Sequence, residues 1–254
     1  MPCVRISASR SRRVRFISST LCVSLESLRS PWEKQIRYRN VVSIGSLIVG
    51  PLLLSIGDSF HPAESLDPDL QVAIIAGSSS LWYGAHLMIF LGLLAFIPGI
   101  IAIGDLVSEK RPALGFIVRN MMLIGAAAFS AVLVFEMLLG RFVAEGAGPE
   151  QATKLLEAFA TPGILGIVLP IIIVALFGGV WLMTWALFVT QPGYRWPASL
   201  LSVGVFLILI EIFSGEVLFS QVGNVALLVG GIGFALKIHR HSQDSQATQR
   251  RQNQ

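Results

Sequence analysis

The stretch LWYGAHLMIFLGLLAFIPGIIAIG, residues 81–104, decides the fold class of this chain. Its side chains are almost all apolar, and His86 is the only one that titrates near neutral pH. An α-helix rises about 1.5 Å per residue, so about 20 such residues cross a hydrocarbon layer about 30 Å thick. The stretch therefore predicts a membrane-spanning helix.

The rest of the chain repeats this pattern. Hydrophobic residues make up 54% of the sequence and charged residues 13%, whereas a soluble domain carries about 25% charged residues. This composition excludes disordered, collagen-like and disulfide-stapled secreted proteins. Further apolar stretches of spanning length cover residues 41–57, 121–140, 164–189, 197–214 and 222–238. The sequence therefore predicts an all-α, multi-pass transmembrane bundle of six spans.

The basic residues predict the orientation of the bundle. Lys and Arg in the loops and tails next to spans are retained on the cytoplasmic side of a membrane. With six spans, both tails and two of the loops share one side, and 17 of the 19 Lys and Arg residues fall there. Only Arg141 and Lys154 fall on the other side. We therefore expect the N and C termini to be cytoplasmic.

The two ends of the chain are interpreted as tails around a membrane domain at residues 41–238. Residues 1–40 form a basic, Ser- and Arg-rich segment that we expect to be disordered and cytosolic, and residues 239–254 form a polar cytosolic tail. These tails favour anionic lipid as a partner, and no nucleic acid is expected. The predicted location is the cell membrane. Residues 1–25 lack acidic residues, so an organelle presequence, with an organelle membrane as destination, is the alternative.

Two outer loops and the start of the second span carry signals of the membrane surface. Asp67 followed by Pro68 is a typical helix start, and Pro149 opens a second amphipathic stretch. Both predict short helices lying on the outer face of the membrane. Trp82 and Tyr83 are expected in the headgroup layer at the outer start of the second span.

Ionisable residues inside spans mark the candidate site. Each costs about 2.5 to 3.5 kcal/mol at the bilayer centre unless something compensates it. The predicted spans place His86, Glu136 and Glu211 in the outer half of the membrane, together with Asn224, and His61 lies in the loop above them. We therefore predict an outward polar cup, a solute or proton site built by His86, Glu136, Glu211 and Asn224, with His61 as a lid.

Two other interpretations use the same side chains. His61, His86, Glu136 and Glu211 are also a ligand set for a divalent cation, although no HExxH or similar motif is present. A hydrogen bond from His86 to a glutamate that merely holds helices in register is the structural alternative. Haem is not expected, because a haem bundle usually offers paired histidines and only one histidine lies in a span.

Glycines and prolines predict how the helices pack. Pro98 and Pro170 remove backbone donors and are expected to kink the second and fourth spans. Gly125, Gly230 and Gly233 allow neighbouring backbones to approach closely, either within the chain or across a homo-oligomer interface.

The functional prediction is permease-like handling of a small solute or cation through the polar cup. A membrane-embedded metal-dependent enzyme and a non-catalytic scaffold or assembly subunit are the alternatives. Whether the protein is an enzyme stays open at this point, because no catalytic motif is present in the sequence.

Overall fold

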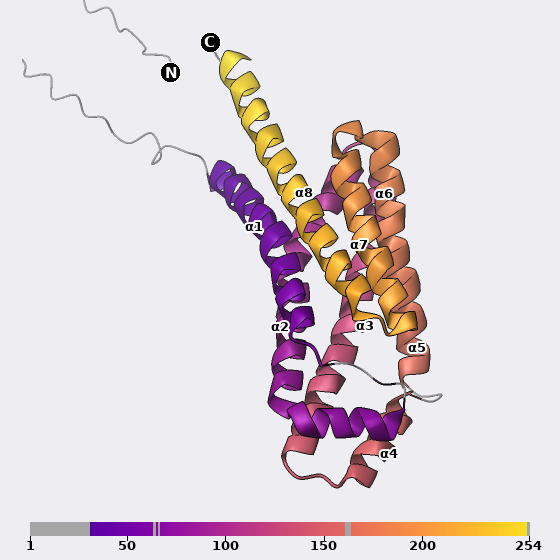
Figure 1. Cartoon of the computed structure of the whole chain (residues 1–254). Helices are drawn as coiled ribbons and strands as arrows, with labels where there is room; N and C mark the ends of the chain where they lie inside the picture. Colours follow the sequence, from indigo (N-terminus) through magenta and orange to yellow (C-terminus); the bar gives the residue numbers. More distant parts are fainter. Residues whose placement is uncertain (1–30, 63–64, 66, 161–163, 253–254) are drawn as a thin grey trace, which may run out of the picture.

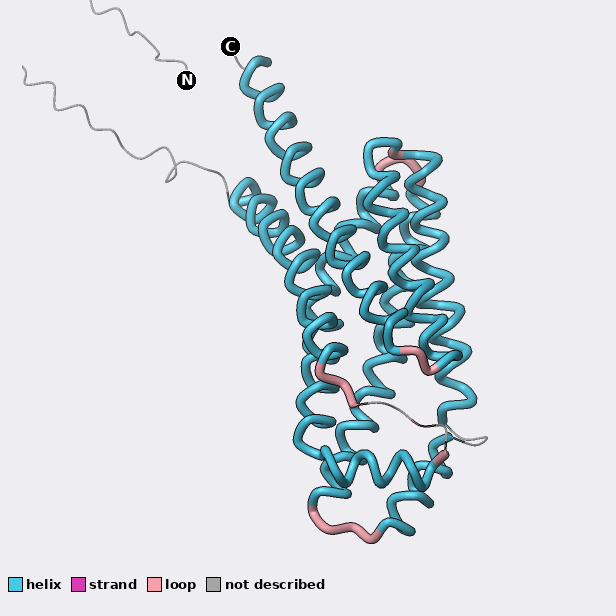
Figure 2. Tube along the Cα trace, in the orientation of Figure 1, coloured by secondary structure: helices cyan, strands magenta, loops and turns pink. Residues whose placement is uncertain are grey.

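A computed structural model of the chain describes residues 31–62, 65, 67–160 and 164–252. The described residues form helices joined by short loops and include no strand (Figures 1 and 2). The all-α prediction is confirmed for this part of the chain. Most of the predicted N-terminal tail, residues 1–30, lies outside it.

The helices follow one another with few intervening residues. Their bounds are α1 Pro31–Ser59, α2 Pro68–Ser108, α3 Pro112–Ala144, α4 Pro149–Ala160, α5 Ile164–Ile171, the π-helix η1 Ile172–Phe177, α6 Gly178–Thr190, the 3₁₀-helix η2 Pro192–Tyr194, α7 Arg195–Ser214 and α8 Val217–Gln252. Six helical segments are long and apolar enough to cross a membrane: Tyr38–Ser59, Pro68–Ser108, Pro112–Ala144, Gly166–Thr190, Pro192–Ile212 and Val217–Gln243. Each contains most or all of one of the six predicted stretches.

Two predicted tail segments are helical instead. Residues 31–40 form the first turns of α1, and residues 239–252 continue α8 (Figure 1). Pro31 suits the first turn of a helix, where its missing N–H has no partner to lose. No proline or glycine follows Ile238 in α8, so nothing in the sequence ends that helix where the apolar residues end.

The two short helices predicted after Asp67 and from Pro149 are present at one end of the molecule, as the first part of α2 and as α4. Asp67 caps α2 by accepting hydrogen bonds from the backbone N–H groups of Asp69 and Leu70. The backbone leaves helical geometry at Ser78 (φ −141°, ψ 30°), so the first part of α2 bends across the ends of its neighbours (Figure 1). This part lies beside α4 (Figure 1), at the end of the molecule away from the first residues of α1 and the last residues of α8, which we call the α4 end.

The fourth candidate span changes helix type after Pro170. The π-helix η1 begins at Ile172, two residues after the proline, and widens the helix before α6 begins. Proline supplies no backbone N–H, so the regular ladder of hydrogen bonds is broken at this point. Gly125 of α3 lies against the widened segment, and a Cβ added there would overlap the backbone of Leu176. The predicted distortion of this span therefore takes the form of a π-helical segment.

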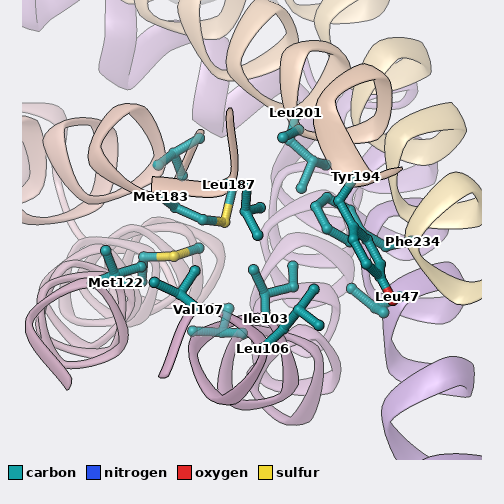
Figure 3. Close-up of a cluster of buried hydrophobic side chains, with 14 of the residues drawn as sticks. Leu47, Ile103, Leu106, Val107, Met122, Met183, Leu187, Tyr194, Leu201 and Phe234 are labelled. Carbon is teal, nitrogen blue, oxygen red and sulfur yellow. The ribbon is translucent and has the colours of Figure 1, made fainter. Parts of the chain in front are cut away.

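The largest buried apolar cluster joins α1, α2, α3, α6, α7 and α8. Leu47, Ile103, Met183 and Phe234 are fully buried in it, and the ring of Tyr194 stacks on Phe234 (Figure 3). This cluster packs the candidate spans together in the part that contains residues 96–107 of α2 and 118–122 of α3, and the polar side chains described next lie outside it.

The small residues predicted to permit close approach pack within the chain. Gly230 lies against Leu201, and Gly233 lies against the indole of Trp196. These contacts account for both glycines without a second copy of the chain. A homo-oligomer through small-residue faces stays a prediction.

Candidate functional site

Three titratable side chains meet near the α4 end. His86 projects from α2, Glu136 from α3, and His61 lies just after the end of α1. The Nε2 atom of His86 lies 2.7 Å from Oε2 of Glu136 and 3.2 Å from Nε2 of His61. Only 1% of the His86 side chain is exposed, against 27% for Glu136. We call this group the His61–His86–Glu136 cluster, in which His86 contacts both of the others.

A tryptophan joins the two helices that carry the cluster. Trp82 precedes His86 by one turn of α2, and its indole Nε1 donates a hydrogen bond to the backbone carbonyl oxygen of Glu136 at 3.0 Å. Gly140, one turn after Glu136, leaves room for this indole, since a Cβ there would lie 2.8 Å from Cδ1 of Trp82. The bond and the glycine bring α2 and α3 together at the height of His86.

The placement of Trp82 corrects the expectation that it lies in the headgroup layer. Its side chain is 1% exposed, and its ring packs on both histidines, with centroid distances of 4.4 Å to His86 and 4.9 Å to His61. Its position at the start of a span predicts a place in the headgroup layer. The spacing of four residues from His86 was the available signal, since residues four apart share a helix face.

The hydrogen bonds of the two histidines determine where their protons lie. Nδ1 of His86 is 2.8 Å from the carbonyl oxygen of Trp82, and Nδ1 of His61 is 2.8 Å from the carbonyl oxygen of Pro62. A carbonyl oxygen only accepts, so each Nδ1 carries a hydrogen. In neutral imidazoles of this tautomer both Nε2 atoms are bare. The contact of 2.7 Å between Nε2 of His86 and Oε2 of Glu136 is a hydrogen-bond length, so this pair requires one further proton.

The remaining proton belongs to His86 and Glu136. Burial, and after it the charge of His86, lowers the pKa of His61 from 6.5 to about 4, although the Glu136 carboxylate and the hydrogen bond to Pro62 act in the opposite direction. His61 is therefore neutral at neutral pH, and its Nε2 carries no hydrogen. The remaining proton lies between Nε2 of His86 and Oε2 of Glu136.

The low pKa of His61 predicts a pH-dependent stability. Below pH 6.5 the unfolded chain protonates this histidine, whereas the folded protein does so only near pH 4. The contribution of neutral His61 to the free energy of unfolding is therefore present above pH 6.5 and falls as the pH drops toward about 4, by at most about 1.4 kcal/mol per pH unit.

Thermal unfolding in detergent should show a smaller loss of stability over this pH range for His61→Gln than for the wild type. His239→Gln, at an exposed position of α8, should keep the wild-type dependence; equal slopes in all three proteins would contradict the prediction.

The other predicted members of the cup lie in a second polar group. Glu211 of α7 is close enough to Asp58 of α1 for their carboxylates to repel each other, and the buried side chains of Ser220 and Asn224 face the same Asp58. The Asp58 atom Oδ2 is buried and has no hydrogen-bond partner among the described residues. The residues predicted to form one cup are thus divided between Asp58 and His86.

The distances in the cluster suit a shared proton. Zinc lies about 2.0 to 2.2 Å from nitrogen and oxygen ligands, so two ligand atoms of a tetrahedral site lie about 3.3 Å apart. The 2.7 Å between His86 and Glu136 is shorter than this and is a hydrogen-bond length. Within the described ranges, no three His, Cys, Asp or Glu residues are placed to hold a metal ion. The metal set of His61, His86, Glu136 and Glu211 stays a prediction.

The function of the chain is inferred from its own residues. Comparison with protein-family models, with curated proteins and with solved structures finds no match to this sequence.

Proposed function

We propose that the protein is a permease of the cell membrane that exchanges protons for a small cation, with the His61–His86–Glu136 cluster as its proton site. The observation that supports this function is the junction of two Nε2 atoms and one carboxylate oxygen, which requires one proton. Both termini are cytoplasmic and the α4 end faces outward in this proposal. The distribution of Lys and Arg supports that orientation.

The charge of the cluster explains why proton and cation would compete. With the junction proton in place, His86 and Glu136 are together neutral, either as an ion pair or as two neutral groups. Loss of the proton leaves the Glu136 carboxylate uncompensated beside a buried histidine. An unpaired charge in apolar surroundings is costly. A small cation arriving at Glu136 would supply the missing positive charge, so its binding favours release of the proton.

Glu136 is the member of the cluster that can meet an arriving ion. Its side chain is partly exposed, whereas His86 is enclosed. A proton on His86 can therefore leave by way of the carboxylate that it already contacts. Transfer along an existing hydrogen bond of 2.7 Å requires no rearrangement of the helices.

Exchange can be tested in proteoliposomes that contain the pH-sensitive dye pyranine. Sodium, potassium, methylammonium and choline would be added separately to the outside of liposomes that have an acidic interior, so that the cation gradient is directed inward and the proton gradient outward. We expect at least one of them to change the internal pH faster than in protein-free liposomes, and His86→Gln to abolish the response. Responses equal to those of protein-free liposomes for every cation would refute the proposed exchange.

A further inference from the structure

We infer that Trp82 is the positioning residue of the proton site: it holds Glu136 at hydrogen-bond distance from His86 and directs Nε2 of His86 toward the carboxylate. The inference rests on the proposed function and assigns Trp82 a role in it. Three separate contacts of the residue support it.

The indole fixes the height of α3 relative to α2. Its Nε1 atom bonds to the backbone oxygen of Glu136 itself, and His86 lies one turn further along the same helix as the indole. The hydrogen bond from Trp82 and the hydrogen bond between His86 and Glu136 therefore join the same two helices at the same residue. Sliding of α3 by about 1 Å would lengthen both, and hydrogen bonds weaken steeply beyond their normal lengths.

The backbone of Trp82 fixes the orientation of the His86 ring. Its carbonyl oxygen accepts from Nδ1 of His86, which leaves Nε2 to face Glu136. The ring then covers the two imidazoles, with interplanar angles of 36° to His86 and 53° to His61. Aromatic rings at these spacings attract one another and exclude other molecules from the contact.

The ring is itself held in place. Trp82 belongs to a buried cluster in which it packs with Val72, Ile75, Leu139 and Ala152. Gly140 lies against the Cδ1 edge of the indole. The cluster includes residues of the bent part of α2 and of α4, so the α4 end of the fold supports the position of the indole.

Two variants test the indole without changing any titratable residue. Trp82→Phe removes the Nε1–H group and keeps both an aromatic ring and the backbone carbonyl. Gly140→Ala keeps the tryptophan and pushes its ring, because the new Cβ would lie 2.8 Å from Cδ1. Gly84→Ala is the matched control, since no atom lies within 4 Å of a Cβ added there.

Two readouts separate positioning from folding. The proton-for-cation exchange rate should fall roughly two- to tenfold in Trp82→Phe and Gly140→Ala, the effect of one lost hydrogen bond, and stay unchanged in Gly84→Ala. ¹⁵N NMR of histidine-labelled protein in lipid bilayers should show a changed Nε2 resonance of His86 with Nδ1 still protonated, because the carbonyl of Trp82 remains. A purely structural role would leave the Nε2 resonance of the folded variants as in the wild type.

The outcomes distinguish the inference from the proposed function. Wild-type exchange and a wild-type Nε2 resonance in both variants would overturn the role of Trp82. If His86→Gln still abolishes exchange in that case, the proposed function is supported without a role for Trp82. Exchange that is unaffected by His86→Gln would overturn the proposed function itself. A changed resonance and slower exchange in both variants, with Gly84→Ala like the wild type, would establish the positioning role.

Discussion

Glu136→Gln is expected to reduce proton-for-cation exchange by at least about tenfold while leaving the protein folded. Glutamine has nearly the same size and can still contact His86, but it cannot become a carboxylate. The junction then loses the negative group that pairs with the shared proton and with an arriving cation. A hydrogen bond to a charged group contributes about 1.5 to 3 kcal/mol, which corresponds to at least about a tenfold change in rate or affinity. Pyranine-loaded proteoliposomes measure the rate directly.

Glu145→Gln is the matched control for this variant. Glu145 lies at the end of α3, and its side chain is 62% exposed and bonded to Arg141 four residues earlier. An exposed pair of this kind contributes about 1 kcal/mol or less, so the control should exchange and unfold like the wild type. Exchange in Glu136→Gln that matches exchange in Glu145→Gln would contradict a role for the carboxylate.

Gly231→Ala is expected to cause the largest loss of stability among single methyl additions. A Cβ at this position of α8 would overlap the backbone carbonyl oxygen of Leu47 in α1. A backbone atom cannot move aside as a flexible side chain can, so the two helices must separate. Overpacking of this kind costs about 1 to 3 kcal/mol or more. Thermal or denaturant unfolding in detergent should show the loss.

Gly45→Ala provides the comparison on α1. No atom lies within 4 Å of a Cβ added there, and replacing glycine by alanine inside a helix otherwise stabilises it by about 0.5 to 1 kcal/mol. Gly45→Ala should therefore be at least as stable as the wild type. Equal stabilities of Gly231→Ala and Gly45→Ala would contradict the close contact between α1 and α8.

The six candidate spans could be predicted because the thickness of a bilayer fixes their length and composition. The helical residues 31–40 and 239–252 could not, since the polarity that ends a membrane span does not end a helix. Helix ends need their own signals, such as the Asp67–Pro68 start that was predicted from sequence and is present in α2. Polarity and helix formation are separate properties of the chain.

Part of the candidate site followed from the cost of burying ionisable groups. That cost predicts a partner for His86, and the structure supplies Glu136 and His61. The cost of burying an ionisable group does not determine which helices face each other. The depth of Glu211 in its span therefore predicts a contact with His86, whereas the structure places Glu211 near Asp58. Trp82 was assigned by its position at the start of a span, although its spacing from His86 is what determines its contacts.

Solid-state ¹⁵N NMR of histidine-labelled protein in lipid bilayers at pH 7 tests the proton assignment most directly. The hydrogen bonds to Trp82 and Pro62 predict that Nδ1 is protonated in both His86 and His61, that Nε2 of His61 is bare, and that Nε2 of His86 shares a proton with Glu136. A bare Nδ1 in either histidine, with the hydrogen on its Nε2 instead, would contradict the shared proton on which the proposed exchange depends.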